Sequence, residues 1–350
     1  VPSGWYLTTE TSEFVDADLE FQGDARDNVA SSVIVYVGTG VAVYVHPSNP
    51  DSQCFAANFN DIAIATFGGA QAAIRAENPS QCVLRHVGIN QAIGASSVVG
   101  LDLVNPNIVR FYEPTVQDCS SAACKISSTG FPSSATNAHV CGGNFYRNEV
   151  VFDIQANLVQ FLVDGAAHFE HFTKLVRIDR DSGADDLQIN SLIIDACEIT
   201  ASTNGYVSKL LDVSVPGTND LIICNLRFTR NWVFFGDAAE NPMQFSMPSV
   251  GSVTGDMAVQ CNVFSNVDTS LIDCVLPGIP AFNVYWHENI RRFGSDFTPL
   301  SASSNAILFQ PAYGGETLTT DLITAAPPAG VHGAEQDLEG TRVTLGVRRN

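Results

Sequence analysis

Short apolar runs alternate with turn-forming residues along most of the chain. Asn, Asp, Gly, Ser and Pro bound these runs, and this pattern predicts β-strands rather than helices. The clearest runs are Val33–Val37, Ile108–Tyr112, Leu175–Ile178, Leu192–Ile194, Leu221–Ile223 and Ala281–Tyr285. Helical periodicity is almost absent, because the best candidate, Gly69–Glu77, is short and Ala-rich and also fits the edge of a strand. The hydrophobic pattern therefore predicts an all-β chain.

A recurring motif divides the middle of the chain: a Cys, a few variable residues, a Phe, and an Asn that closes the strand. Three segments follow this motif, Cys141–Asn148, Cys224–Asn231 and Cys261–Asn266, and Cys197–Thr200 is a shorter version. Cys197 and Cys224 are 27 residues apart and Cys54 and Cys82 are 28 apart, whereas Cys82 to Cys119 and Cys224 to Cys261 are each 37, as expected if some coils carry insertions. A fixed period is the signature of stacked structural units. A large β-sandwich or jelly roll with coincidental Cys spacing is the alternative.

The period has a direct physical interpretation. A coil of about 22–28 residues holds three short strands, and equivalent positions stack about 4.8 Å apart on the next coil. Small apolar or thiol side chains then form inward ladders, and Asn at a corner can bond to its equivalent in the neighbouring coil. In this pattern residues 50–290 resemble the right-handed parallel β-helix proteins, which include pectate-lyase-like enzymes and bacteriophage tailspikes. The resemblance implies a right-handed parallel β-helix solenoid.

The two ends of the chain differ from its middle. Residues 1–30 hold seven acids and one base, and Val33–Val45 is either a hairpin or the first turn that caps the solenoid. From about Phe293 the composition shifts to Ser, Thr, Ala, Pro and Gly, with little apolar content for a core. We therefore predict an N-terminal arm and cap at 1–45, a parallel β-helix at 46–292, and a C-terminal oligomerisation arm at 293–350 that lies on a partner subunit.

Charge narrows the possible partners. The chain has 37 Asp and Glu against 17 Lys and Arg, a formal net charge of −20. Such a surface repels phosphate groups and anionic lipids, so we expect no nucleic-acid and no membrane partner. Charged residues make up only 15% of the chain and hydrophobic residues 45%, which indicates a large core and a surface partly covered by other subunits.

No membrane segment or export signal is evident. The longest apolar stretch, Val33–Val45, is shorter than the roughly 20 residues that a spanning helix needs. The N-terminus lacks the features of a signal peptide, and the sequence leaves open whether Val1 is the natural first residue. The nine Cys residues show neither CxxC nor Cys/His zinc spacing, so we expect buried free thiols in a reducing compartment, no metal and no cofactor.

The strongest candidate for chemistry is the acidic segment that follows Arg177. Its carboxylates are Asp179, Asp181, Asp185 and Asp186. Two of them could act as acid and base or nucleophile in glycoside hydrolysis. They could instead bind calcium, with Arg177 or Arg180 as the base of a lyase. A plain surface turn with paired charges is the third interpretation. The set of calcium aspartates and basic residue typical of pectate lyases cannot be assigned residue by residue.

Two further clusters carry weaker signals. In a regular strand His168 and Glu170 would share one face and His171 would take the other, so at most two metal ligands would converge there. An aromatic group could stack on sugar rings or pack a subunit interface; it comprises Trp232, Phe234, Phe235 and Phe245. The chain has no GxSxG, P-loop, HExxH or dinucleotide motif.

These observations predict a non-enzymatic structural protein of a virion, made in the host cytoplasm. We expect a β-helical bacteriophage tail spike or capsid-surface decoration protein that assembles as a homotrimer and contacts other virion proteins. The alternative is a polysaccharide-degrading β-helix enzyme, either a lyase or a glycoside hydrolase, or a carbohydrate-binding adhesin. In those cases host-surface polysaccharide would be the ligand.

Overall fold

The computed structural model is built from strands alone in the part of the chain that it describes. The described residues are 2–16, 18–23, 25–26, 29–30, 32–50, 52, 56–128, 136–179, 187–201, 209–214, 221–239, 241–246, 253–268, 270–275, 281–292, 297–304, 306–311 and 318–322. They form a 20-stranded sheet, a 13-stranded sheet and a two-stranded hairpin. The all-β prediction is therefore confirmed, and Gly69–Glu77, the best helix candidate, contributes strand β10 (Ala70–Glu77).

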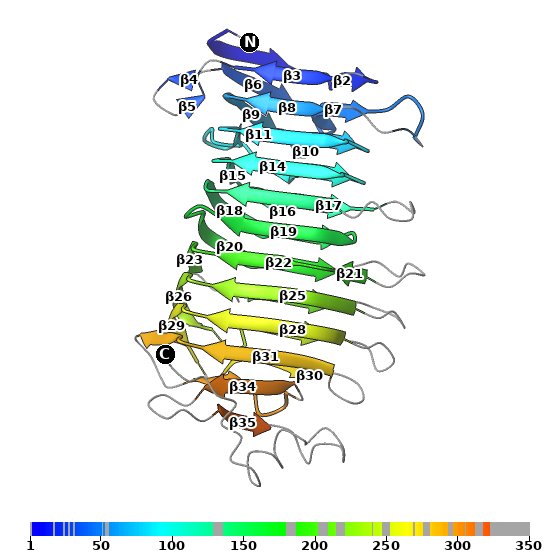
Figure 1. Cartoon of the computed structure of the whole chain (residues 1–350). Coiled ribbons are helices and arrows are strands. Elements are labelled where there is room, and N and C mark those ends of the chain that lie inside the picture. Colours follow the sequence, from blue (N-terminus) through cyan, green and yellow to red (C-terminus); the bar gives the residue numbers. More distant parts are fainter. Residues whose placement is uncertain are drawn as a thin grey trace.

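Apart from the last strand of the described chain, the strands of both large sheets pair in parallel with the strands one coil earlier and one coil later. Asn144 pairs with His168 in this way, and Glu198 pairs with Trp232. The strands consequently stack in chain order from one end of the molecule to the other (Figure 1). This arrangement is consistent with a parallel β-solenoid. Some coils, such as the one from Glu198 to Trp232, are longer than the roughly 22–28 residues of a coil without insertions, as the longer Cys spacings also suggested.

The pairings form three ladders, with each coil adding a strand to each ladder. Ladder 1 contains β1 (Gly4–Thr8), β6 (Ser32–Val37), β9 (Ile62–Phe67), β12 (Gly88–Ile89), β15 (Thr115–Gln117), the first parts of β18 (Asn144–Gln155) and β20 (His168–Asp179), β23 (Glu198–Ala201), β26 (Trp232–Ala239), β29 (Val263–Val267) and β32 (Ile290–Arg292). Ladder 2 contains β2 (Ser12–Val15), β7 (Val41–His46), β10, β13 (Ser97–Val104), β16 (Cys119–Ser127), the second parts of β18 and β20, β24 (Lys209–Ser214), β27 (Met243–Ser246), β30 (Ser270–Val275) and β33 (Thr298–Leu300).

Ladder 3 is the 13-stranded sheet. It contains β3 (Leu19–Gln22), β8 (Ala57–Asn60), β11 (Gln81–Arg85), β14 (Ile108–Tyr112), β17 (Thr136–Cys141), β19 (Leu158–Asp164), β21 (Leu187–Ile189), β22 (Leu192–Asp195), β25 (Leu221–Thr229), β28 (Val253–Gln260), β31 (Ala281–His287), β34 (Ile307–Pro311) and β35 (Leu318–Leu322). Strand β35 pairs antiparallel with β34, and β4 (Ala25–Arg26) forms the small hairpin with β5 (Val29–Ala30).

The parallel register stacks apolar side chains inside the molecule. One inward row of ladder 3 consists of Phe21, Phe59, Leu84, Phe111, Val140, Val163, Ile194, Phe228, Val259 and Trp286, each paired with the next. All but Phe21 are buried, and the Phe21 and Phe59 rings stack with centroids 5.4 Å apart. Because side chains alternate between the two faces of a strand, only every second residue joins such a row, and its apolar contacts run from coil to coil.

The cysteines do not stack as the sequence motif predicts. Cys82 and Cys124 do point into the apolar interior, as expected of inward thiols. However, Cys197 is buried at a corner, whereas Cys224 is exposed within β25. The prediction that these two residues are equivalent is wrong, because Glu198 pairs with Trp232, which makes Asn231 the counterpart of Cys197 in the next coil. All eight cysteines in the described residues are free.

Regular parallel pairing extends into both predicted arms. Strands β1 and β6 pair with each other, and Val33–Val45 supplies β6 and β7, which pair with β9 and β10 instead of forming a hairpin. At the other end, β33 and β34 lie within the segment 293–350 and pair in parallel with β30 and β31. Residues 323–350 lie outside the described part of the chain.

Substitution of Phe152 tests whether the aromatic side chains of neighbouring strands form one core. Its ring centroid lies 5.2 Å from that of Phe145, 5.0 Å from that of Phe161 and 5.9 Å from that of Phe169, and the Phe152 residue is 1% exposed. We predict that Phe152→Ala lowers the free energy of unfolding by about 3–5 kcal/mol, because it leaves a cavity among aromatic rings. Phe234→Ala, which removes a 38% exposed ring, is the matched control and should cost less than about 1 kcal/mol. Denaturant unfolding followed by circular dichroism measures both; equal losses would contradict a shared core at Phe152.

Candidate functional site

Charged side chains form a row along the outer face of ladder 2. Successive register partners in this row are Tyr44, Arg75, Asp102, Lys125, Asp153, Arg177, Asp212, Gln244 and Asp273. From Arg75 to Asp212 the sign of the charge alternates at every coil. Because stacked positions are only about 4.8 Å apart, alternation converts a repulsive arrangement into an attractive one. We call these residues the charged row.

The tightest pair in the charged row joins Arg177 to Asp153. Arg177 donates from Nε to Asp153 Oδ1 at 2.9 Å and from Nη2 to Oδ2 at 2.7 Å, and Gln155 also donates to Oδ2 at 3.0 Å. Only 2% of the Asp153 side chain is exposed, and the bonds to Asp153 raise the pKa of Arg177 despite its partial burial. Asp212, another member of the charged row, lies 2.6 Å from Nζ of Lys174, which is outside the row. Each of these carboxylates is neutralised by a cation, which suits structure better than acid–base chemistry.

Asp179 is the one predicted catalytic carboxylate that the structure describes. It ends β20, shortly after Arg177, and pairs with Ser214 in the next coil. Its charge contributes to the raised pKa of Arg177. Asp181, Asp185 and Asp186, together with Arg180, lie outside the described residues. A working pair of carboxylates in this segment therefore stays a prediction.

The His168–His171 cluster differs from the sequence expectation. His171 adopts a left-handed backbone conformation with φ of 54°, and its Nε2 lies 3.0 Å from Glu170. His168 Nε2 lies 3.9 Å from the same carboxylate, and all three side chains are about one-third exposed. The expectation that His171 points to the opposite face is wrong, because β20 turns a corner at His171 between ladder 1 and ladder 2 and does not continue as a regular strand.

The aromatic group divides between the surface and the interior. Trp232 is 55% exposed and Phe234 is 38% exposed, whereas Phe235 and Phe245 are buried in the core. Strand alternation explains the division between Phe234 and Phe235, since neighbouring residues of a strand point to opposite faces. Of the four aromatic residues, Trp232 and Phe234 are therefore the two placed to meet a ligand or another chain.

A second polar feature lies at the corner where the ladder 3 strands end. The residue at this corner repeatedly has a left-handed backbone, as in Asp61, His86, Glu113, Gly142, Gly165, Ala196, Arg230, Cys261 and Glu288. At most of these positions the corner N–H donates to a carbonyl of the next coil; for example, Arg230 bonds to Gln260 and Cys261 bonds to His287, both at 3.0 Å. Left-handed conformations of non-glycine residues are uncommon, and here the regular stack of backbone bonds stabilises them.

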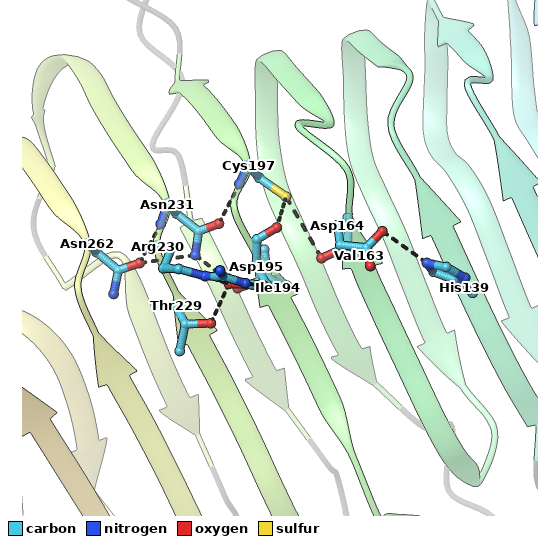
Figure 2. A network of polar contacts seen from close by, with 10 residues as sticks. All are labelled: His139, Val163, Asp164, Ile194, Asp195, Cys197, Thr229, Arg230, Asn231 and Asn262. Atoms are coloured by element: carbon cyan, nitrogen blue, oxygen red, sulfur yellow. Dashed lines mark hydrogen bonds and ion pairs between the residues drawn. The ribbon is translucent and has the colours of Figure 1, made fainter.

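An asparagine ladder continues from this corner. The backbone N–H of Asn231 donates to Asn262 Oδ1 at 2.9 Å, and that of Asn262 donates to Asn289 Oδ1 at 3.0 Å. The side-chain amide of Asn262 also donates to the carbonyl oxygen of Phe228 at 2.7 Å. Figure 2 shows Asn231 and Asn262 together with Cys197, whose N–H bonds to Asn231 at 3.0 Å. The predicted bonding of corner Asn residues to their equivalents is confirmed for these three coils.

Asp195 and Cys197 lie beside the asparagine ladder, and their pKa values shift in opposite directions. Asp195 accepts hydrogen bonds from Arg230 and from Thr229, at 2.7 Å for Thr229, and these bonds lower the pKa of Asp195 (Figure 2). Burial raises the pKa of Cys197 to about 12. A thiol of this kind is protonated at neutral pH and is a poor nucleophile.

His139, Cys141 and Asp164 meet at the same corner, three coils before the asparagine ladder. His139 Nε2 lies 2.9 Å from Asp164 Oδ1, and one ligand atom from each of the three residues lies within 4.8 Å of the other two. In the described part of the chain, this is the one such group of His, Cys, Asp and Glu side chains. Burial, followed by the charge of Asp164, raises the pKa of Cys141.

The sequence search for zinc-type Cys/His spacing missed this group. Its detectable signal is the His-x-Cys spacing, since residues two apart in a strand share one face. The third member, Asp164, stands beside Cys141 because the two residues are register partners in neighbouring coils.

Neither a family model, nor a curated protein, nor a solved structure matches this chain. The described residues contain no helix of the length and apolarity needed to cross a membrane. The fold and its polar features define an all-β protein with long parallel sheets, one large core with a small separate apolar cluster, and polar groups stacked along its faces and corners.

The Asp153–Arg177 pair provides one prediction. We expect Arg177→Met to lower the free energy of unfolding by about 3–5 kcal/mol, because it leaves a buried carboxylate without its cation. Adding Asp153→Asn should restore most of that loss, so the two effects should not be additive in chemical denaturation. Arg147→Met is the matched control: Arg147 binds Asp118 with both bonds at 2.7 Å but is 51% exposed, so its loss should be below about 1 kcal/mol. Additive losses at Asp153 and Arg177 would contradict the coupling.

The Asp195–Arg230 pair predicts a pH dependence. Because the pKa of Asp195 is lowered in the folded state, its contribution to stability is present above the unfolded pKa of about 3.9 and is lost as the pH falls through the folded pKa. We expect Arg230→Met to have a lower melting temperature than the unaltered chain near neutral pH. The difference should shrink as the pH falls below about 3.9 toward the lowered folded pKa of Asp195. Thermal melts across this pH range measure it, and a difference that does not change with pH would exclude a charge effect.

Proposed function

We propose that this chain is a structural virion protein: a right-handed parallel β-helix that assembles as a homotrimer into a phage tail spike or a capsid-surface decoration. The observation that carries the proposal is the parallel pairing that continues from β1 to β34, with one apolar core along its length. Stacked main-chain bonds and a continuous core give a stiff rod with few points for a protease to enter.

The pairing of charges supports a scaffold role. The charged row satisfies its own carboxylates from neighbouring coils, as Arg177 does for Asp153. The corner also uses its polar groups to join coils, as Asn262 does for Asn231. These groups stabilise the rod and leave few of their polar atoms for a substrate.

An exposed apolar surface supports assembly. On the first two coils of ladder 1, Trp5 is 68% exposed, Leu7 is 72% exposed and Val37 is 43% exposed. Trp5 pairs with Val33 and Leu7 with Val35, so the apolar side chains are adjacent on one face. Val33 belongs to a small apolar cluster separate from the main core. Contiguous exposed apolar groups of this kind favour burial against another protein surface, and a second copy of the chain is the simplest partner for a spike.

The oligomeric state tests the proposal. Light scattering coupled to size exclusion should give three times the 37.4 kDa mass of the chain. We expect Leu7→Asp to shift the protein toward smaller species without changing its circular dichroism spectrum. Val159→Asp is the matched control, since Val159 is 38% exposed on β19 of ladder 3 and lies far from this surface.

A stable monomer in dilute buffer would overturn the trimeric spike. A monomer that also releases reducing ends or unsaturated products from polysaccharides would favour the alternative, a polysaccharide-degrading β-helix enzyme. In that case alanine substitution of Asp179, alone and with Asp181, would test the acidic segment as its site.

A further inference from the structure

The backbone register brings His139, Cys141 and Asp164 together. His139 and Cys141 lie two positions apart in β17, so both side chains leave the same face of the strand. Asp164 ends β19 in the next coil, where it is the register partner of Cys141. The three side chains therefore converge because two paired strands end together, and the 2.9 Å contact between His139 Nε2 and Asp164 Oδ1 is one result.

A glycine keeps the space beside the thiol open. Gly142 and Gly165 occupy the left-handed corner position, with φ of 69° and 71°. A Cβ atom at Gly165 would lie 2.9 Å from Cys141 Sγ and 2.8 Å from the backbone nitrogen of Gly142. The turn itself does not require glycine, because Ala196 and Arg230 adopt the same backbone conformation in later coils. At position 165 glycine permits a close approach to both the sulfur of Cys141 and the backbone of Gly142.

The three ligand atoms match the preferences of a borderline transition metal. Imidazole nitrogen, thiolate sulfur and carboxylate oxygen are all ligands of Zn²⁺, whereas Ca²⁺ and Mg²⁺ prefer oxygen alone. The His139 and Asp164 side chains are 35% and 31% exposed, so water can reach the group and complete a tetrahedral set. Ligand atoms within 4.8 Å of one another need only small movements to surround one ion.

We propose that His139 Nε2, Cys141 Sγ and a carboxylate oxygen of Asp164 bind one divalent transition-metal ion, with Zn²⁺ as the preferred ion. The ion replaces the His139–Asp164 hydrogen bond, and Cys141 binds as a thiolate after releasing its proton to solvent. Since the ligands come from β17 and β19, the ion joins two successive coils. This inference does not depend on the virion proposal, because it concerns the corner alone.

Cobalt provides the direct test. The full-length chain, stripped of metal with a chelator, is titrated with Co²⁺ and then with Zn²⁺. We expect one Co²⁺ per chain, an ultraviolet thiolate-to-cobalt charge-transfer band, loss of that band on addition of Zn²⁺, and a higher melting temperature with Zn²⁺. X-ray absorption of the zinc form should give one sulfur neighbour at about 2.3 Å.

Single variants test the ligands. Cys141→Ser should abolish the charge-transfer band, and His139→Gln and Asp164→Asn should each weaken binding at least about tenfold, since even the loss of a residue that only supports a ligand costs that much. Cys224→Ser and Cys261→Ser remove exposed thiols, and His86→Ala removes a histidine that lies 2.9 Å from Asp61 at the same corner. All three controls should bind Co²⁺ as the unaltered chain does.

Several outcomes would overturn the site. They are no stoichiometric binding by the unaltered chain, a charge-transfer band that survives in Cys141→Ser, or a band that disappears in Cys224→Ser or Cys261→Ser. If Cys141→Ser fails to fold, as judged by circular dichroism, the nearly isosteric Asp164→Asn and the X-ray absorption of the unaltered chain decide the question.

Discussion

Main-chain hydrogen bonding between successive coils is the interaction on which the rest of this structure depends. Each ladder pairs a strand with its counterparts one coil away along the chain, and the register of that pairing decides which side chains stack. A side chain therefore has two kinds of neighbour, those beside it in the chain and its equivalents in the coils before and after. The apolar rows of the core, the charged row and the asparagine ladder are all consequences of the second kind of neighbour.

Stacking imposes opposite requirements on apolar and charged positions. Apolar residues gain from repetition, as in the stacked rings of Phe21 and Phe59, because each coil covers the apolar surface of its neighbour. Charged residues cannot repeat with the same sign at about 4.8 Å without repulsion. Their alternation in the charged row satisfies this constraint, and the burial of Asp153 beneath Arg177 shows how closely the pairs pack. A low charged fraction of 15% is in keeping with such a scaffold.

The strands could be predicted from the sequence, whereas the register could not. Apolar runs such as Ile108–Tyr112 coincide with strands, because alternation within a strand is a local property. Corner Asn bonding was also foreseen, and Asn231 takes part in it. Equivalence between coils is not a local property. Because coil lengths vary, Cys197 and Cys224 do not occupy equivalent positions, and the left-handed backbone of His171 turns its side chain away from the face that strand alternation predicts. Asp164 meets Cys141 only through that non-local register, which explains why the His139 group escaped a search based on spacing.

The corner of ladder 3 separates backbone architecture from side-chain chemistry. The same left-handed turn accepts Gly142, Ala196 and Arg230, and each donates its N–H to the next coil, so these backbone bonds do not dictate the residue. Asp164 and Asp195 end ladder 3 strands in successive coils and acquire different partners: Asp164 joins His139 of the preceding coil, whereas Asp195 joins Arg230 of the following coil. An ion pair and a group of metal-ligand type thus occupy equivalent places on one scaffold. Side chains at this corner therefore add contacts between coils to those of the main-chain ladder.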